Sequence, residues 1–235
     1  MFVYIGAEMK IHRFYLPDMN FEHNFWLKDG PILHQWTKVL RFRPGQVVVL
    51  FDGQKQDIQY KITEITNTEA HLEYITDREL QLPKRELYLF WSLLKKDKND
   101  WVLQKCTELG VSHFMPLIAD RSEKTGFNIE RAQKIVIEAS EQCGRSDIPR
   151  IRDAMHITNA IEQYADTMPL YICEQGSEES TFAAEKLGVL IGPEGGWSDA
   201  EKQLFKDRSI KHLSLHDFTL RAETASVAVA SKLLS

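Results

Sequence analysis

The spacing of apolar and polar residues changes near residues 82–84, Leu-Pro-Lys. Before this point the chain carries short runs of β-branched and aromatic residues separated by polar turns, which is typical of strands. The runs that predict strands are 11–16, 46–51, 57–65 and 70–75. Together they indicate a small antiparallel barrel or sandwich.

One helix is predicted between the first two of these strands. Apolar residues recur at helical spacing from Ile32 to Leu40. Pro31 suits the first turn of a helix, and Pro44-Gly45 ends it.

After Pro83 the strand patterns alternate with helical ones. Residues 86–94 form a nearly continuous apolar run, as expected for a strand that is buried on both faces. Further strands are predicted at 113–118, 170–173, 188–191 and 211–215, and helices at 101–109, 129–143, 198–207 and 222–234. Because strands that alternate with helices form mainly parallel sheets, the sequence predicts an N-terminal β domain followed by an α/β domain.

The composition is that of a folded protein of one or two domains. The chain has 235 residues, of which 43% are hydrophobic and 27% charged. No run approaches the roughly 18 apolar residues of a membrane span, and no signal peptide is predicted. The three cysteines, Cys106, Cys143 and Cys173, cannot all pair and fit no zinc spacing. We therefore expect a cytoplasmic protein without a metal, in which Cys106 and Cys143 are small core residues.

The net charge of −5 argues against a protein that binds nucleic acid by bulk electrostatics. The basic residues are clustered, however. One cluster, free of acids, contains His34, Lys38, Arg41 and Arg43; a second contains Lys95, Lys96 and Lys98. Together with Arg13 in the first predicted strand, the first cluster can hold RNA by shape and stacking, although a solvated helix face is an equally good interpretation.

The strongest chemical motif is residues 189–201, Val-Leu-Ile-Gly-Pro-Glu-Gly-Gly-Trp-Ser-Asp-Ala-Glu. An apolar strand runs into a glycine-rich turn, and Ser198 and Glu201 form a capping box that begins a helix. In an open α/β sheet, ligands bind at this end of a strand. A tight connection that needs glycine for geometry alone is the alternative. The segment matches neither a dinucleotide-binding loop nor a nucleotide phosphate loop, so those ligands are disfavoured.

A second strand-to-helix segment spans residues 212–226, and it leads into a helix rich in small residues. An ordinary buried helix explains the small residues. Arg221 and Glu223 are harder to explain in this way, because charges at the mouth of an apolar strand commonly form an ion pair or a site. Residues 105–111 and 138–145 are weaker motifs. The second places Glu138, Glu141, Gln142 and Arg145 on one polar helix face, which is typical of a solvated surface.

These motifs together resemble the ribosomal RNA small subunit methyltransferase E family. The resemblance extends over nearly the whole chain, and the order and spacing of its segments make it specific. The segments that carry it are 11–15, 39–41, 45–53, 105–111, 138–145, 190–196 and 220–225.

The resemblance implies an S-adenosylmethionine-dependent enzyme that methylates N3 of one specific uridine in 16S rRNA of the small ribosomal subunit. It implies a PUA-like β-barrel RNA-binding domain over residues 9–82 and a SPOUT α/β-knot methyltransferase domain over residues 83–235. The latter carries a deep trefoil knot and forms a homodimer. No membrane and no metal are implied.

The resemblance also implies roles for individual residues. One side of the cofactor is expected to contact Ile191, Gly192, Glu194, Gly195 and Gly196, and the other side Leu213, Ser214, Leu215, His216 and Leu220. Arg221 is expected to stabilise a uracil anion, with Glu223 either orienting it or relaying a proton. Arg13, Lys38, Arg41 and Arg43 are expected to bind rRNA.

The chain departs from the family pattern at two positions. His216 stands where the family has glycine, and Phe218 stands where it has arginine. Either the loop bends differently here, or the usual glycine does not require a positive φ. The missing arginine puts one RNA or cofactor contact in doubt. Residues 1–8 precede the family's usual start, and we predict them to be poorly ordered.

Two other functions remain open at this point. A methyltransferase of the same superfamily could act on another RNA, such as tRNA. A PUA-type RNA-binding protein without catalysis is a second alternative, and the intact glycine turn at residues 192–196 argues against it.

Overall fold

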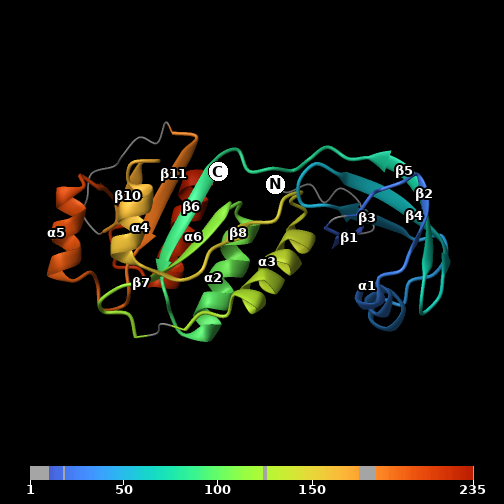
Figure 1. Cartoon of the computed structure of the whole chain (residues 1–235), viewed down its shortest axis with the longest axis horizontal. Helices are drawn as coiled ribbons and strands as arrows, with labels where there is room; N and C mark the ends of the chain where they lie inside the picture. Colours follow the sequence, from blue (N-terminus) through green and yellow to red (C-terminus); the bar gives the residue numbers. More distant parts are fainter. Residues whose placement is uncertain (1–10, 18, 124–125, 175–183, 235) are drawn as a thin grey trace, which may run out of the picture. The chain divides into compact units, whose positions relative to one another are not determined.

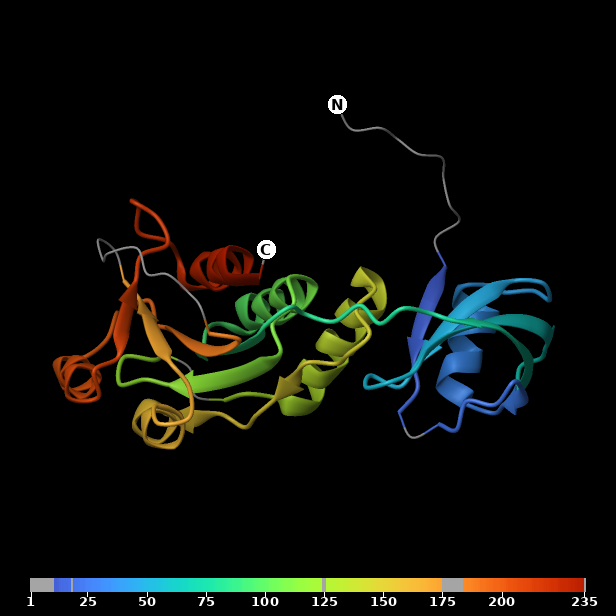
Figure 2. The same ribbon diagram turned by 90° about the horizontal axis from the view of Figure 1, so that it is seen from above.

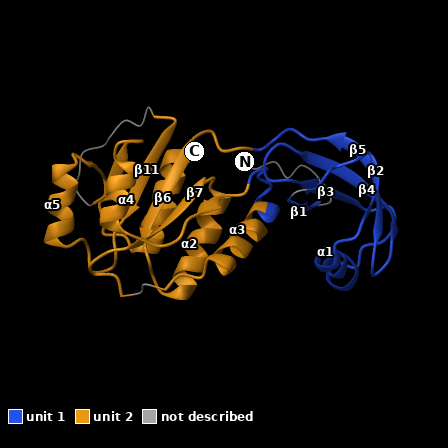
Figure 3. Ribbon diagram, viewed as in Figure 1, with its two compact units in different colours: residues 1–81, 141–147 blue, residues 82–140, 148–235 orange. Residues whose placement is uncertain are grey.

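The computed structural model describes residues 11–17, 19–123, 126–174 and 184–234. The chain divides into two compact units, one containing residues 1–81 and 141–147 and the other residues 82–140 and 148–235 (Figure 3). The first unit is therefore built from two stretches of chain that are far apart in the sequence. The predicted extension at residues 1–8 lies outside the described residues.

The first unit contains a five-stranded sheet in the order β1-β3-β4-β5-β2. Its strands are β1 (His12–Tyr15), β2 (Asn24–Leu27), β3 (Val47–Phe51), β4 (Asp57–Ile65) and β5 (Ala70–Asp77). The prediction of a wholly antiparallel sheet was wrong for one pair, because β1 runs parallel to β3. Parallel neighbours need a crossover, and here it contains β2, which the sequence analysis missed, and the helix that follows it.

The predicted helix of the first unit is present, but its second half is wound differently. The α-helix α1 (Gly30–His34) continues as a π-helical turn, η1 (Gln35–Val39). The carboxylate of Asp29 caps the start by accepting the N–H of Ile32 at 2.9 Å. In the wider turn the N–H of Leu40 reaches the carbonyl of Gln35, five residues back.

The second unit contains a parallel sheet in the order β12-β10-β11-β6-β7-β8, with β9 paired to β7. Its strands are β6 (Glu86–Ser92), β7 (His113–Ile118), β8 (Arg150–Ile151), β9 (Met155–His156), β10 (Leu170–Cys173), β11 (Lys186–Ile191) and β12 (Lys211–Leu213). The predicted parallel α/β architecture is confirmed. The two-residue strands β8 and β9 are too short to give a periodic signal.

Helices cover both faces of this sheet (Figures 1 and 2). They are α2 (Lys96–Glu108), α3 (Ile129–Cys143), α4 (Ile157–Tyr164), α5 (Asp199–Asp207) and α6 (Ala222–Leu234). The central strand β6 explains the layers, because its residues alternate between two cores. Leu87, Leu89 and Trp91 pack with α2, α3 and α6, whereas Tyr88 and Phe90 pack with α4 and α5.

The structure tests the expectation that Cys106 and Cys143 are core residues. Cys106 is buried in the core of the second unit, as predicted, but Cys143 is exposed at the end of α3, so that prediction was wrong. Burial raises the pKa of the Cys106 thiol well above its usual range.

Within the described ranges, no helix has both the length and the apolar character needed to span a bilayer.

Candidate functional site

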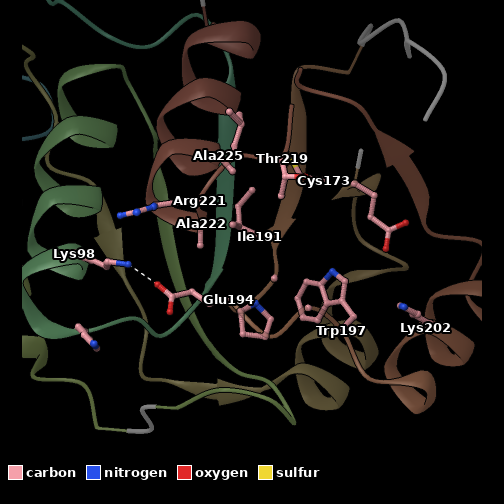
Figure 4. Close-up of a pocket in the computed structure, with 16 residues that line it drawn as sticks. Lys98, Cys173, Ile191, Glu194, Trp197, Lys202, Thr219, Arg221, Ala222 and Ala225 are labelled. Atoms are coloured by element: carbon pink, nitrogen blue, oxygen red, sulfur yellow. Dashed lines mark hydrogen bonds and ion pairs between the residues drawn. The ribbon is translucent and has the colours of Figure 1, made fainter. Parts of the chain in front are cut away.

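A cavity of about 730 Å³ opens beside the carboxyl ends of β10 and β11 in the second unit (Figure 4). Open α/β sheets bind their ligands at this edge. Residues from both strongest sequence motifs line it: Ile191, Gly192, Glu194, Gly196, Leu220 and Arg221. The structure therefore brings together two segments that the sequence analysis singled out separately.

The glycine turn after β11 is shaped by a buried tryptophan. A Cβ atom on Gly192 would lie 3.0 Å from the indole of Trp197, so a side chain at this position would require the ring to move by a few tenths of an ångström. Trp197 is itself fixed by an edge-to-face contact with Phe205 on α5, with ring centroids 5.1 Å apart. Gly196 has φ of +68°, a conformation that favours glycine. The backbone therefore favours glycine at position 196, and the packing of Trp197 favours it at position 192.

The predicted capping box at the start of α5 is present. Ser198 Oγ accepts the N–H of Glu201 at 3.2 Å, and the Glu201 carboxylate accepts the N–H of Ser198 at 2.6 Å. The other Glu201 oxygen accepts the N–H of Asp120 at 2.9 Å. A hydrogen bond thereby connects the loop after β7 to the helix that follows the glycine turn.

Lys98 on α2 connects the two halves of the cavity wall. Its ammonium pairs with Glu194 of the glycine turn, as Figure 4 shows, and lies 3.3 Å from Glu223 Oε1 at the start of α6. The hydrogen bond from Lys98 lowers the pKa of the Glu194 carboxyl, and the same bond raises the pKa of Lys98. One lysine is therefore held in its charged form between two carboxylates.

The two predicted catalytic residues lie at the start of α6. Arg221 lines the cavity and is exposed; in Figure 4 its guanidinium points away from Trp197 and Thr219. Glu223 is more buried, with a side chain 15% exposed, and its Oε2 has no hydrogen-bond partner among the described residues. Its carboxylate contacts Lys98, a residue that the sequence analysis did not assign to the site.

The remaining predicted cofactor residues are spread around this edge. Leu215, His216 and Leu220 line a smaller neighbouring cavity of about 120 Å³. The carbonyl of Gly195 accepts a hydrogen bond from Arg121 at 3.0 Å. The other two residues face elsewhere: Leu213 is buried in the core, and the carbonyl of Ser214 accepts a bond from Lys232 at 3.4 Å.

The loop around His216 folds without the strain that the missing glycine suggested. Among the described residues other than glycine, only Arg41 and Ser209 have a positive φ. His216 is therefore not in the left-handed region, and its side chain costs the backbone nothing there.

Several residues of the cavity wall were not predicted. They are Lys95, Lys98, Cys173, Glu174, Pro193, Trp197, Lys202, Thr219, Ala222 and Ala225. A signal for the two lysines was present, because the cluster at residues 95–98 follows the end of β6. Since β6 and β11 are parallel neighbours, their carboxyl ends meet at the same edge. That pairing, however, is a tertiary property and cannot be read from either strand alone.

Arg13 in the first unit is committed to an internal ion pair. Its guanidinium donates to both carboxylate oxygens of Asp57, at 3.1 and 2.7 Å, and to the carbonyl of Arg145 at 3.2 Å. Arg13 also lies over the ring of Phe51, 4.8 Å from its centroid. Asp57 is 2% exposed and accepts a further bond from Ser146. This geometry gives Arg13 a structural role.

The other predicted RNA-binding residues, Lys38, Arg41 and Arg43, are exposed around the end of η1. Arg41 adopts φ of +55° and turns the chain out of the helix. The predicted polar face of α3 is only partly solvated. Glu138 and Gln142 are exposed, whereas Glu141 accepts the N–H of Tyr15 at 2.9 Å.

Comparison with known proteins defines the class to which this fold and site belong. The family model of an RNA methyltransferase domain matches residues 81–234, more than half of the chain, and that of an RNA methyltransferase PUA domain matches residues 37–74. The protein is therefore a member of the RNA methyltransferases that carry a PUA domain.

Curated relatives narrow this class. The chain is 34% identical over 177 residues to ribosomal RNA small subunit methyltransferase E of Helicobacter pylori strain 26695, covering 73% of this chain and 77% of that protein. For the enzymes of the same name from Aquifex aeolicus and Rickettsia conorii, the identities are 30% and 28%. The alignment with the Aquifex aeolicus enzyme covers 74% of this chain and 80% of that enzyme, and the alignment with the Rickettsia conorii enzyme covers 95% of each. The chain belongs to the ribosomal RNA small subunit methyltransferase E family.

Solved structures agree with this assignment. The ribosomal RNA small subunit methyltransferase E of Neisseria gonorrhoeae, bound to S-adenosylmethionine, matches with a TM-score of 0.83 and 26% identity over 95% of this chain and 96% of its own. A Legionella pneumophila methyltransferase in complex with the same cofactor matches with a TM-score of 0.85 and 25% identity over 96% and 97%. The predicted α/β methyltransferase fold with a PUA-like domain is confirmed, and the knot stays a prediction.

Proposed function

We propose that this protein transfers a methyl group from S-adenosylmethionine to N3 of one specific uridine in 16S rRNA of the small ribosomal subunit. The observation that carries the proposal is that the glycine turn and Arg221 line one cavity, with Glu223 paired to Lys98 of the same cavity wall. Family membership supports it, since relatives covering most of the chain are named as small-subunit rRNA methyltransferases.

The residues around the cavity suit S-adenosylmethionine. Ile191, Trp197 and Leu220 offer apolar surface for a flat adenosine, and the Gly192 and Gly196 backbone can approach a ligand closely. The carboxylates of Glu174 and Glu194 offer partners for the positive charges of the cofactor. When bound, this cofactor supplies an electrophilic methyl group. We assign the cofactor-contacting role to the predicted residues that line the main cavity and to Gly195.

Arg221 and Glu223 prepare the uridine for reaction in this proposal. Uridine N3 carries a proton and is a poor nucleophile until that proton leaves. Arg221 stabilises the negative charge that develops on the neighbouring uracil oxygens. We assign to Glu223, whose Oε1 is held by Lys98, the role of orienting Arg221 or of relaying the proton from N3. Holding the nucleoside in line with the methyl group supplies much of the remaining acceleration.

The first unit supplies RNA contacts in the same proposal. Lys38, Arg41 and Arg43 are exposed and contact phosphates, whereas Arg13 is left out because Asp57 occupies its guanidinium. With a net charge of −5 and few cationic contacts, affinity for naked RNA is modest, and its decrease with salt reflects only those few phosphate contacts. A homodimer formed through the methyltransferase domain, in the cytoplasm, completes the proposal.

Methyl transfer from labelled S-adenosylmethionine tests this function. Small subunits, free 16S rRNA and tRNA are offered as separate substrates, and cofactor binding is measured by calorimetry. We expect transfer to 16S rRNA, free or in the subunit, and saturable cofactor binding. Transfer to tRNA alone would assign a different substrate. RNA binding without any cofactor binding would replace the enzyme with a non-catalytic RNA-binding protein.

A further inference from the structure

The loop between β12 and α6 presents an aromatic side chain to solvent. Phe218 is 75% exposed, more than any other large hydrophobic residue recorded as exposed in the described part of the chain. Single exposed apolar residues are common on proteins and require no explanation by themselves. The surroundings of this one are unusual in three respects.

First, the ring of Phe218 packs against the imidazole of His216. The rings of His216 and Phe218 are stacked, with centroids 5.2 Å apart and planes inclined by 29°. The backbone N–H of Phe218 also donates to Nδ1 of His216 at 3.1 Å. The imidazole therefore supports one side of Phe218 and leaves the rest of the ring open. A braced aromatic surface loses little conformational freedom when a flat partner stacks on it.

Second, the ring lies next to the reaction cavity but not inside it. His216 and Phe218 line the smaller cavity, whose wall shares Thr219, Leu220 and Ala225 with the main one. Phe218 is not among the residues that line the main cavity. A cofactor held in the main cavity therefore leaves the exposed face of Phe218 uncovered.

Third, the main cavity next to this ring carries a charge of the sign that attracts RNA, whereas the smaller cavity that the ring itself lines has one charged lining residue, Glu174. The main cavity is lined by four cations, Lys95, Lys98, Lys202 and Arg221, and by two carboxylates, Glu174 and Glu194, which gives a net charge of +2. The whole chain carries −5. The positive potential is thus local to the cavity, and it favours a polyanion over a second acidic copy of this chain.

We propose that Phe218, braced by His216, stacks on an unpaired nucleobase of the RNA substrate at the mouth of the reaction cavity. Aromatic side chains beside basic residues bind single-stranded RNA in this way, because every base has a face that can stack. The proposal rests on the proposed function in taking RNA as the substrate. We call this pair, Phe218 and His216, the stacking platform.

Three variants of the full-length protein test the platform: Phe218→Tyr, which keeps an aromatic ring, Phe218→Leu, which keeps an apolar side chain, and Phe218→Ala. We expect Leu and Ala to raise the KM for RNA roughly tenfold, as for the loss of one stacked base, and Tyr to stay within about twofold of the parent. The calorimetric Kd for S-adenosylmethionine stays unchanged in all three. Because the ring is exposed, the thermal midpoints should also stay unchanged.

Each other outcome overturns the platform in a recognisable way. Equal KM values for RNA in Phe218→Leu and Phe218→Tyr would show that Phe218 does not stack on a base. A weaker Kd for S-adenosylmethionine reassigns Phe218 to the adenine of the cofactor. A loss of self-association in sedimentation reassigns it to a second copy of this chain.

Ultraviolet crosslinking of bound 16S rRNA, mapped by mass spectrometry, gives a readout independent of activity. We expect a nucleotide on Phe218 of the parent protein. If the protein crosslinks there but methylates no RNA, the proposed function fails and the platform stands. If it methylates 16S rRNA with no crosslink at Phe218 and no change in KM, the platform alone fails.

Discussion

Lys98 Nζ lies 3.3 Å from Glu223 Oε1 while it also pairs with Glu194. One side chain on α2 thereby connects the glycine turn after β11 with the start of α6. These three segments are distant in the sequence, and the predicted cofactor-binding and catalytic residues lie on two of them. The geometry of the site therefore depends on a residue that need not touch either substrate.

Replacing Lys98 with methionine tests this connection. The change leaves the carboxylates of Glu194 and Glu223 as like-charged neighbours without their shared cation, so we expect both to move apart. The predicted result is a fall in kcat of at least tenfold, with partial recovery in Lys98→Arg.

The pH profile distinguishes a positioning role from a general loss of stability. Lys98 lowers the pKa of the Glu194 carboxyl, so without it that carboxyl takes up a proton at a higher pH. The acid limb of the kcat/KM profile should then move towards neutral pH in Lys98→Met and remain in place in Lys98→Arg. A variant with unchanged kcat and an unchanged profile contradicts the positioning role.

Arg221→Ala should separate binding from chemistry. The cation proposed to stabilise the uracil anion is lost, whereas the apolar walls and the glycine turn remain. We expect cofactor affinity within a few-fold of the parent and methyl transfer reduced by about 10²-fold or more, the usual effect of removing one group that stabilises a developing oxyanion. Arg208→Ala, at the end of α5, is the matched control and should keep full activity. Undiminished turnover by Arg221→Ala would refute its catalytic role.

Gly188→Ala should destabilise the second unit without touching the cavity. A Cβ at this position would lie 2.5 Å from Leu170 and 2.8 Å from Phe90, inside the sheet core. Overpacking of this kind costs about 1–3 kcal/mol, so the thermal midpoint should fall by several degrees. Gly30→Ala in α1 is the control, because no atom lies within 4 Å of its added methyl group. Equal thermal midpoints for the two variants would show that the core accommodates a methyl group at Gly188.

The ion pair between Arg13 and Asp57 predicts a stability effect in the first unit. Arg13→Ala leaves a buried carboxylate without its cation, which costs about 3–5 kcal/mol. We expect urea unfolding to shift strongly for this variant. The exposed Arg41→Ala should leave unfolding unchanged and instead weaken RNA binding and its dependence on salt. If Arg13→Ala is as stable as the parent but binds RNA poorly, Arg13 belongs to the RNA surface after all.

The strands and helices with long periodic patterns could be predicted from the sequence. The strand from Asp57 to Ile65 and the helices 129–143 and 222–234 have the bounds that the sequence analysis gave them. The pairing of strands could not be predicted in the same way. The parallel contact between β1 and β3 and the four-residue strand β2 depend on the tertiary crossover and leave no periodic signal.

The same distinction holds for the site. The glycine turn and Arg221 carry a local signature, and the resemblance to a family gave them roles. Lys98 carries no such signature, because its importance arises from the neighbouring positions of β6 and β11. Arg13 shows the reverse: a cation in a strand fits an RNA contact equally well until Asp57 is found beside it. The role of a charged residue therefore depends on the residues that the tertiary structure brings into contact with it.

Mass spectrometry of 16S rRNA from cells that lack this gene tests the central claim most directly. We predict that one N3-methyluridine disappears from 16S rRNA, and that the parent gene restores it whereas the Arg221→Ala gene does not. Modification of tRNA should be unchanged. An intact N3-methyluridine content of 16S rRNA, or a methyl group lost from another RNA, would contradict the account.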